Sequence, residues 1–203
     1  MDRRTSIQWL MAAAAVGSSL EASAKPNTKP TQGIGADPDL VRKYKSGELW
    51  PLSFTERERR CANALCGLII PADEGSPSAA ELKVEVFIDE WISAPYEDQQ
   101  KDRTVILKGL AWLDTESEKR FGAVFAAAKL EQQAEIADQI CKPLPKDAPL
   151  HESAHFFAKF RDLTAGGFYT TPEGMKDVGY VGNVPSQTFD GPPAAVIKLV
   201  GVS

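Results

Sequence analysis

The chain has 203 residues, a net charge of -5, 43% hydrophobic residues and 8% aromatic residues. This length and composition predict one soluble globular domain with a sizeable core, and the regular apolar periodicity excludes a mostly disordered chain. The 23 basic residues against 28 acidic ones leave no basic excess to neutralise phosphates, which argues against a nucleic-acid partner. The two histidines and three cysteines also limit metal, thiol and histidine chemistry.

The first 24 residues predict a cleavable export signal. An apolar run over 9–16 is too short to span a membrane as a helix, so no stable membrane span is expected. Ala22 and Ala24 then form a small-residue cleavage site, and cleavage is expected after Ala24.

Arg3 and Arg4 precede the apolar run and resemble a twin-arginine signal, which exports proteins already folded. Ser6 departs from that pattern, because such signals usually carry Phe at this place. The other interpretation is a disordered cytoplasmic tail with two chance arginines. The twin-arginine interpretation predicts a periplasmic protein.

Residues 25–52 are rich in Pro, Gly, Lys and Asp, which predicts an extended arm or linker. A helical domain is expected over 53–203, with a tail that is rich in Gly and Pro. The expected helices carry capping residues or a helical apolar period, and they span about 53–70, 78–94, 98–121, 130–141, 150–165, a short stretch from 171, and 192–200. No strand alternation is visible, so the predicted class is all-α, a small irregular helical bundle.

Two details of these helices are specific predictions. The second helix has the clearest apolar stripe, which is expected to face the core: Val84, Phe87, Ile88, Trp91 and Ile92. Trp50, Trp91 and Trp112 are expected to be core anchors. Gly166-Gly167 is expected to end the fifth helix as a left-handed cap.

His151-Glu152-Ser153-Ala154-His155 matches the pattern of zinc hydrolases, in which two histidines bind the metal and the glutamate is the general base. The chain has no third histidine, so a third ligand would have to be a carboxylate such as Glu173. A helical wheel also turns the two histidines away from the apolar side of the helix. A solvated or partner-facing polar face is the favoured interpretation, and a zinc hydrolase is the alternative.

The cysteines and acidic pairs have structural interpretations. Cys61 and Cys66 lie five residues apart on an expected helix and therefore point in different directions. A disulfide from Cys141 to one of them is one expectation, and three buried thiols are the other. Asp89-Glu90 is expected to be solvated or to lie at a helix end, because neighbouring helix positions do not face each other. We therefore expect no catalytic, cofactor-binding or metal-binding residue in this chain.

Three stretches carry a family resemblance: Leu65 to Asp73, Val86 to Trp91, and the long run from Phe156 to Asn183. They resemble the gluconate 2-dehydrogenase subunit 3 family, the small subunits of periplasmic flavin-dependent sugar and polyol dehydrogenases. The resemblance implies a subunit that carries no flavin itself and escorts a large subunit of the glucose-methanol-choline type, which binds FAD. Relatives that oxidise the 3-hydroxyl of glucosides share similar stretches.

The resemblance implies partner chains, and the residues that contact the large subunit are a hypothesis from the sequence. With no cytochrome attachment motif in the sequence, an electron acceptor such as a cytochrome c would lie on another chain. The large-subunit interface is expected to include residues that follow Gly166-Gly167: Phe168, Tyr169, Thr170, Tyr180 and Asn183. The alternative is that Phe168 and Tyr169 fill the core of this chain.

Overall fold

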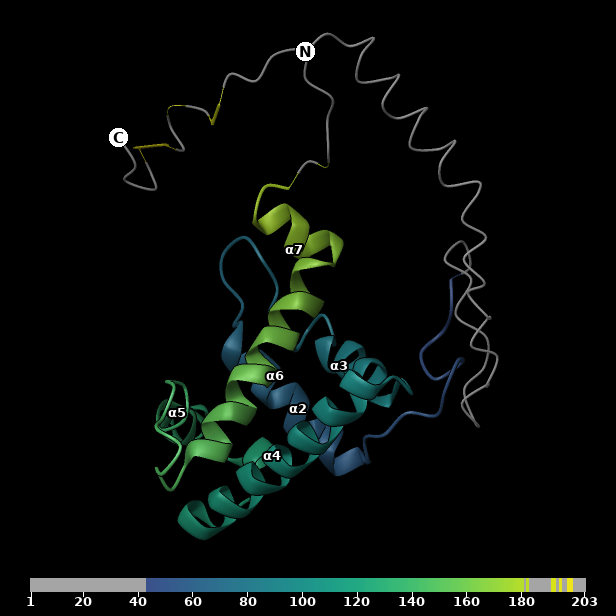
Figure 1. Ribbon diagram of the computed structural model, residues 1–203. Coiled ribbons are helices and arrows are strands. Elements are labelled where there is room, and N and C mark those ends of the chain that lie inside the picture. The colour runs from purple at the N-terminus through teal and green to yellow at the C-terminus, as the bar shows by residue number, and fades with distance from the viewer. Residues whose placement is uncertain (1–42, 181, 183–190, 193, 195–196, 199–203) are drawn as a thin grey trace, which may run out of the picture. The chain divides into compact units, whose positions relative to one another are not determined.

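The computed structural model describes residues 43–180, 182, 191–192, 194 and 197–198. The predicted export signal with Arg3, Arg4, Ala22 and Ala24, most of the arm, and Asn183 lie outside these residues. Within them every regular element is a helix, as Figure 1 shows: α2 (Glu56–Ile69), α3 (Val84–Ser93), α4 (Glu97–Phe121), the short 3-10 helix η1 (Phe125–Ala127), α5 (Leu130–Asp138), α6 (His151–Tyr169) and α7 (Pro172–Asp177). The predicted all-α class is confirmed.

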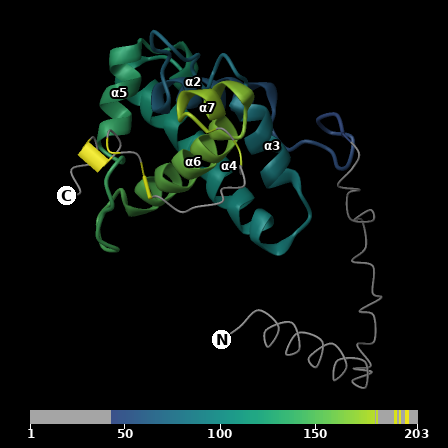
Figure 2. The same cartoon turned by 90° about the horizontal axis from the view of Figure 1, so that it is seen from above.

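Four helices enclose the core. α2, α3, α4 and α6 all contact one another, and their apolar faces bury residues such as Leu65, Ile88, Leu110 and Phe160 almost completely. α5 packs against α4 on the side of the bundle away from α3, and α7 packs against the C-terminal end of α6 (Figures 1 and 2). The described part of the chain holds no helix long and apolar enough to cross a membrane.

Local sequence signals place several helix ends. The helix expected over 98–121 is α4, which begins one residue earlier. Thr171 caps α7 as expected, since its hydroxyl accepts a hydrogen bond from the Gly174 amide at 3.0 Å. The helix expected over 130–141 ends at Asp138, because the amides of Gln139 and Ile140 bond carbonyls only three residues back.

Two helices begin later than expected. The capping box of α2 uses Thr55 and Glu58, so the helix starts at Glu56 rather than Ser53. Ser78 and Glu81 do form reciprocal hydrogen bonds, and the two bonds from Ser78 lower the pKa of the Glu81 carboxyl. The chain then turns at Lys83, whose φ of 55° is left-handed, and α3 starts only at the next residue.

The prediction that Gly166-Gly167 caps its helix is wrong, because α6 continues through both glycines to Tyr169. Gly167 instead allows α3 to pack against the backbone of α6. A Cβ at Gly167 would lie 2.7 Å from side-chain carbons of both Val84 and Phe87. Gly167 therefore serves helix packing, and neither glycine reverses the chain.

A glycine also allows close packing where α4 crosses α6. A Cβ at Gly109 would lie 2.0 Å from ring carbons of Phe156. The Phe156 ring, which is 1% exposed, thus lies directly on the backbone of α4. α3 and α4 both approach α6 closely because one residue at each contact is glycine.

α3 is oriented differently from the prediction. Val84, Ile88 and Ile92 are buried as expected, but Phe87 and Trp91 are 38% and 36% exposed. The remaining buried positions of α3 are polar: Glu85, Asp89 and Ser93. Trp91 is therefore not the core anchor that was expected, whereas Trp112 packs partly buried against the core.

Asp89 is the centre of the polar side of α3. Its carboxylate is fully buried and accepts hydrogen bonds from the amides of Ser53 and Phe54 at 2.9 and 3.0 Å. Its other oxygen pairs with Arg59 of α2 at 3.0 Å. The expectation of a solvated or helix-end position for Asp89 is wrong, because a buried carboxylate needs these partners to offset its desolvation.

The neighbouring residue, Glu90, holds the segment before Ser53. Its carboxylate accepts a hydrogen bond from the Gly47 amide, and its backbone carbonyl accepts one from the Trp50 indole at 3.2 Å. The Trp50 ring also contacts Tyr96 edge-on at 6.3 Å between centroids. The last residues of the predicted arm are thus attached to the C-terminal end of α3.

We predict that Asp89→Asn lowers the free energy of unfolding by about 2–4 kcal/mol. The substitution removes the charge that pairs with Arg59 and replaces one acceptor oxygen with a donor, so a buried group loses a partner. Urea denaturation of the purified chain measures the change. Asp98→Asn is the control, because that side chain is 85% exposed and its loss is expected to cost within about 0.5 kcal/mol. Equal stability of the two variants would contradict the anchoring role of Asp89.

Candidate partner-binding surface

Two aromatic side chains of α3 form an exposed pair that we call the α3 aromatic face, composed of Phe87 and Trp91. Their ring centroids lie 6.4 Å apart. The Trp91 indole donates a hydrogen bond to Asp102 of α4 at 3.0 Å, and Asp102 also pairs with Lys159 of α6 at 3.0 Å. The indole is therefore held in one orientation before any partner arrives, which reduces the entropy cost of binding.

The choice of residues on α3 favours a second role for this face. Folding alone favours the opposite arrangement, with aromatic rings inside and carboxylates outside. α3 instead buries Glu85 and Asp89 and exposes Phe87 and Trp91. Exposed apolar groups that lie together on a surface are typical of sites that bind another molecule.

Gly166 precedes Gly167 on α6 and is exposed. A Cβ at this position would meet no atom within 4 Å, so nothing inside the chain requires glycine here. Glycine within a helix costs about 1 kcal/mol relative to alanine. The Thr170 hydroxyl donates to the carbonyls of Gly166 and Gly167 at 2.9 and 3.0 Å. The exposed backbone at Gly166 is available for close approach by another protein.

The residues predicted for the interface have different environments. Phe168 is 1% exposed and fills the core of this chain, as the alternative interpretation held. Tyr169, Thr170 and Tyr180 are exposed, and Tyr169 contacts the Phe168 ring edge-on at 5.1 Å. Phe168 therefore positions Tyr169 but cannot itself contact a partner. Asn183 lies outside the described residues.

These exposed residues do not form one continuous patch with the α3 aromatic face. Tyr169 follows Gly167 by two positions, which is about 200° around a helix. Since Gly167 faces Phe87, Tyr169 points to the opposite side of α6. The sequence did contain a signal for the outward aromatics, because Glu85, Asp89 and Ser93 recur every four residues. The sequence could not show whether this polar stripe or the stripe with Phe87 and Trp91 faces inward.

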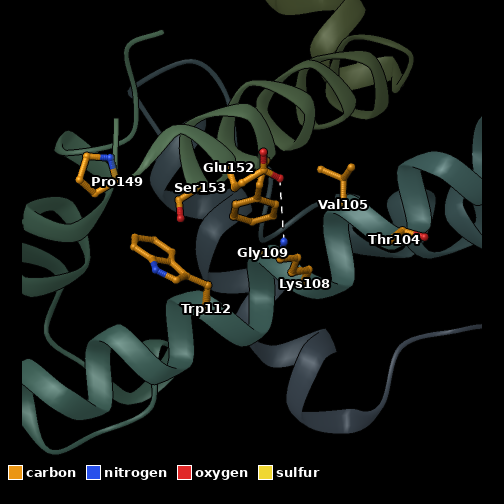
Figure 3. Close-up of a pocket in the computed structure, with 9 residues that line it drawn as sticks. Thr104, Val105, Lys108, Gly109, Trp112, Pro149, Glu152 and Ser153 are labelled. Carbon is orange, nitrogen blue, oxygen red and sulfur yellow. Dashed lines mark ion pairs between the residues drawn. The ribbon is translucent and has the colours of Figure 1, made fainter. Parts of the chain in front are cut away.

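The histidine motif does not assemble a zinc site. His151 lies at the start of α6, and its Nδ1 is hydrogen-bonded to the Leu144 carbonyl at 2.9 Å. Glu152 turns toward α4, where it lies 3.9 Å from the Lys108 ammonium (Figure 3). Glu152 and the two histidines line different cavities, so the glutamate is not placed to activate a water on their metal.

The expected third ligand is also remote from the histidines. Gly174, next to Glu173, packs on the Phe168 carbonyl at the far end of α6. The 13 residues from His155 to Phe168 correspond to about 20 Å along a helix. Within the described residues no group of three His, Cys, Asp or Glu side chains could hold a metal ion.

Glu152 and Lys108 lie at the edge of a cavity of about 280 Å³ between α4 and α6. Trp112 and Pro149 flank one end of it (Figure 3), and Phe156 is part of its lining. Its shape depends on Gly109, which lets the Phe156 ring lie against α4. The Glu152 and Lys108 side chains are 74% and 72% exposed and pair with each other at 3.9 Å, so they lie on the rim of the cavity and not in its depth.

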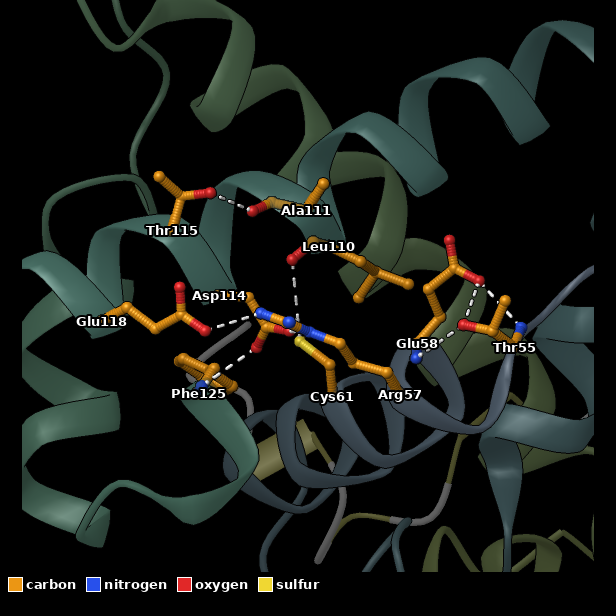
Figure 4. Close-up of polar contacts among 10 residues, drawn as sticks. All are labelled: Thr55, Arg57, Glu58, Cys61, Leu110, Ala111, Asp114, Thr115, Glu118 and Phe125. Carbon is orange, nitrogen blue, oxygen red and sulfur yellow. Dashed lines mark hydrogen bonds and ion pairs between the residues drawn. The ribbon is translucent and has the colours of Figure 1, made fainter. Parts of the chain in front are cut away.

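A second polar cluster joins α2, α4 and η1 around Asp114 (Figure 4). The Asp114 carboxylate pairs with Arg57 at 2.5 Å and accepts a hydrogen bond from the Phe125 amide at 3.0 Å. Arg57 also pairs with Glu118 at 2.8 Å. The hydrogen bond and charge of Asp114 are the main causes that raise the pKa of Arg57. Since each group has a structural partner, this cluster stabilises the fold and is not a reactive site.

All three cysteines are free, so the expected disulfide from Cys141 is wrong. Cys61 and Cys66 lie in the core on α2, whereas Cys141 is partly exposed beyond the end of α5. Burial raises the pKa of the Cys61 thiol, and the negative charge of Asp114 adds to this. Burial also raises the pKa of Cys66 to about 12, although a hydrogen bond with Thr164 opposes the shift.

We predict that a thiol reagent labels Cys141 alone in the folded chain. At pH 8 the raised pKa values keep Cys61 and Cys66 protonated as well as inaccessible, and the thiolate is the reactive form. Mass spectrometry after iodoacetamide treatment is expected to find one label per native chain and three in 6–8 M urea. Labelling of either α2 cysteine at the rate of Cys141 would contradict the burial described above.

Comparison with known proteins identifies the family of this helical domain. The family model described as gluconate 2-dehydrogenase subunit 3 matches residues 56–191, which is more than half of the chain. No curated protein and no solved structure matches. The family provides small subunits of dehydrogenase complexes. The chain belongs to the gluconate 2-dehydrogenase subunit 3 family.

Proposed function

We propose that this chain is the non-catalytic small subunit of a periplasmic dehydrogenase. In this proposal it carries the twin-arginine signal for a large subunit of the glucose-methanol-choline type and stabilises that subunit after export. The large subunit binds FAD and oxidises a sugar or glucoside, with the 3-hydroxyl of glycosides as the expected position. Electrons pass to an acceptor on a further chain, such as a cytochrome c.

The observation that carries this proposal is the orientation of α3. The helix exposes Phe87 and Trp91 while it buries Asp89 and Glu85, and the Trp91 indole is held by Asp102. Aromatic side chains held in one orientation are the groups that contribute most to protein interfaces. Family membership suggests that the partner is a dehydrogenase subunit, because members of this family are subunits of dehydrogenase complexes.

The export part of the proposal is based on the sequence before residue 43. Arg3 and Arg4 with the cleavage site at Ala22 and Ala24 predict transport of a folded protein. A flavoprotein has to bind its cofactor before it leaves the cytoplasm, so a folded route suits it. A large subunit without a signal can use this route only when it is already bound to the subunit that has one.

We predict that the double substitution Arg3→Lys with Arg4→Lys leaves the co-expressed flavoprotein in the cytoplasm. The fraction of dehydrogenase activity released from the periplasm is expected to fall at least tenfold, while total activity in the cell extract remains. Arg42→Lys is the control, because it is an equally conservative change beyond the cleavage site. Unchanged periplasmic activity in the double variant would overturn the escort role.

We predict that Trp91→Ser removes an interface anchor and costs about 2 kcal/mol of binding to the flavoprotein, or roughly thirtyfold in affinity. Leu130→Ser is the matched control, since Leu130 is a 63% exposed apolar residue on α5, away from α3. Pull-down and titration with the flavoprotein compare the two variants, and thermal melting checks that both are folded. Equal affinity of the two variants would show that the α3 aromatic face does not bind the large subunit.

A further inference from the structure

A small cavity lies where the chain after α5 passes the outer side of α6. Its volume is about 200 Å³. The walls are apolar and include Pro143, Leu144, Ala154 and Ala158. The two alanines lie one helical turn apart on α6, and their short side chains leave the depth of the cavity open.

The polar groups that line this cavity are basic: Lys142, His151, His155 and Arg161. Among the described residues that line it, the only other ionisable group is the Cys141 thiol, and none is a carboxylate. This is unusual for a chain with a net charge of -5. The cavity therefore complements a negatively charged occupant.

Two of the basic groups have defined surroundings. His151 uses Nδ1 for the Leu144 carbonyl, which leaves Nε2 as the ring nitrogen that can contact an occupant. The side chain of Arg161 is 51% exposed, and its one ion pair within the described part of the chain is with the adjacent Asp162, at 3.2 Å. The Asp162 side chain is itself 70% exposed. Such an exposed pair is weak, so the guanidinium can exchange it for a better-placed carboxylate.

The size of the cavity decides which kind of carboxylate fits. Typical small-molecule sites measure roughly 300–1,000 Å³, so this cavity accepts only a few heavy atoms. The binding free energy of a free ligand is limited by its number of atoms, and so small a carboxylate would bind weakly by itself. An acidic side chain that belongs to a docked protein loses no further translational or rotational freedom of its own when it enters the cavity. Its aliphatic carbons can also contact the apolar walls.

We propose that this cavity receives an aspartate or glutamate side chain of the large subunit, with Arg161 as its main partner and Lys142 and His155 beside it. This inference rests on the proposed function, because it assumes that the flavoprotein is the partner. In this proposal the histidine motif has a role other than zinc binding, because His151 and His155 form part of a receptor for a carboxylate.

The test measures the affinity of the flavoprotein for the wild-type chain and for Arg161→Glu, Arg161→Gln and Arg60→Glu. Arg60→Glu is the control, because it makes the same charge change at a 63% exposed arginine on α2. We expect Arg161→Glu to weaken binding at least tenfold, Arg161→Gln to weaken it less, and the control to bind within twofold of wild type. Thermal melting shows whether each variant is folded, and Arg161→Gln serves if Arg161→Glu is not.

The possible outcomes separate this inference from the proposed function. Binding of both Arg161 variants within twofold of wild type overturns the cavity proposal, while the complex itself still forms. No binding of the wild-type chain overturns the proposed function. A titration of the isolated chain with sodium acetate, monitored through the histidine NMR signals, tests whether a free carboxylate binds in the cavity. Saturation that Arg161→Gln abolishes, together with unchanged flavoprotein binding, would assign the cavity to small anions and overturn docking of an acidic side chain.

Discussion

The buried carboxylate of Asp89 is the constraint on which the arrangement of this domain depends. It gathers the amides of Ser53 and Phe54 and the guanidinium of Arg59, and so joins the start of the domain and α2 to α3. A buried carboxylate without such partners would be too costly to keep charged. Once Asp89 faces inward, the rotation of α3 about its axis is determined.

This rotation has consequences on the other side of the helix. Phe87 must lie at the edge between core and solvent, and Gly167 on α6 is needed to accommodate it. Trp91, one turn further on, reaches solvent and is oriented by Asp102. The outward position of Phe87 and Trp91, on which the proposed partner contact is based, therefore follows from the same polar contacts that stabilise the fold. A chain that evolved only for stability would have little reason to keep buried carboxylates and exposed aromatic rings on the same helix.

The residues of α6 show how one helix can separate groups that are adjacent in sequence. Glu152 faces α4 and Lys108, whereas His151 and His155 line the basic cavity on the other side. At the C-terminal end, Phe168 enters the core and Tyr169 remains exposed. A pattern such as two histidines around a glutamate predicts chemistry only if all three side chains converge, and here the 100° step of the helix separates them.

The sequence by itself determined the all-α class, most helix positions, the cap at Thr171, and the family resemblance, because these depend on local periodicity and capping. Only the tertiary structure decided which face of α3 is buried, that Gly166 and Gly167 continue a helix, and that the three cysteines stay free. Each of these depends on what another helix presents at the same place. Local patterns state which side chains can share a face, and packing between distant segments decides where that face points.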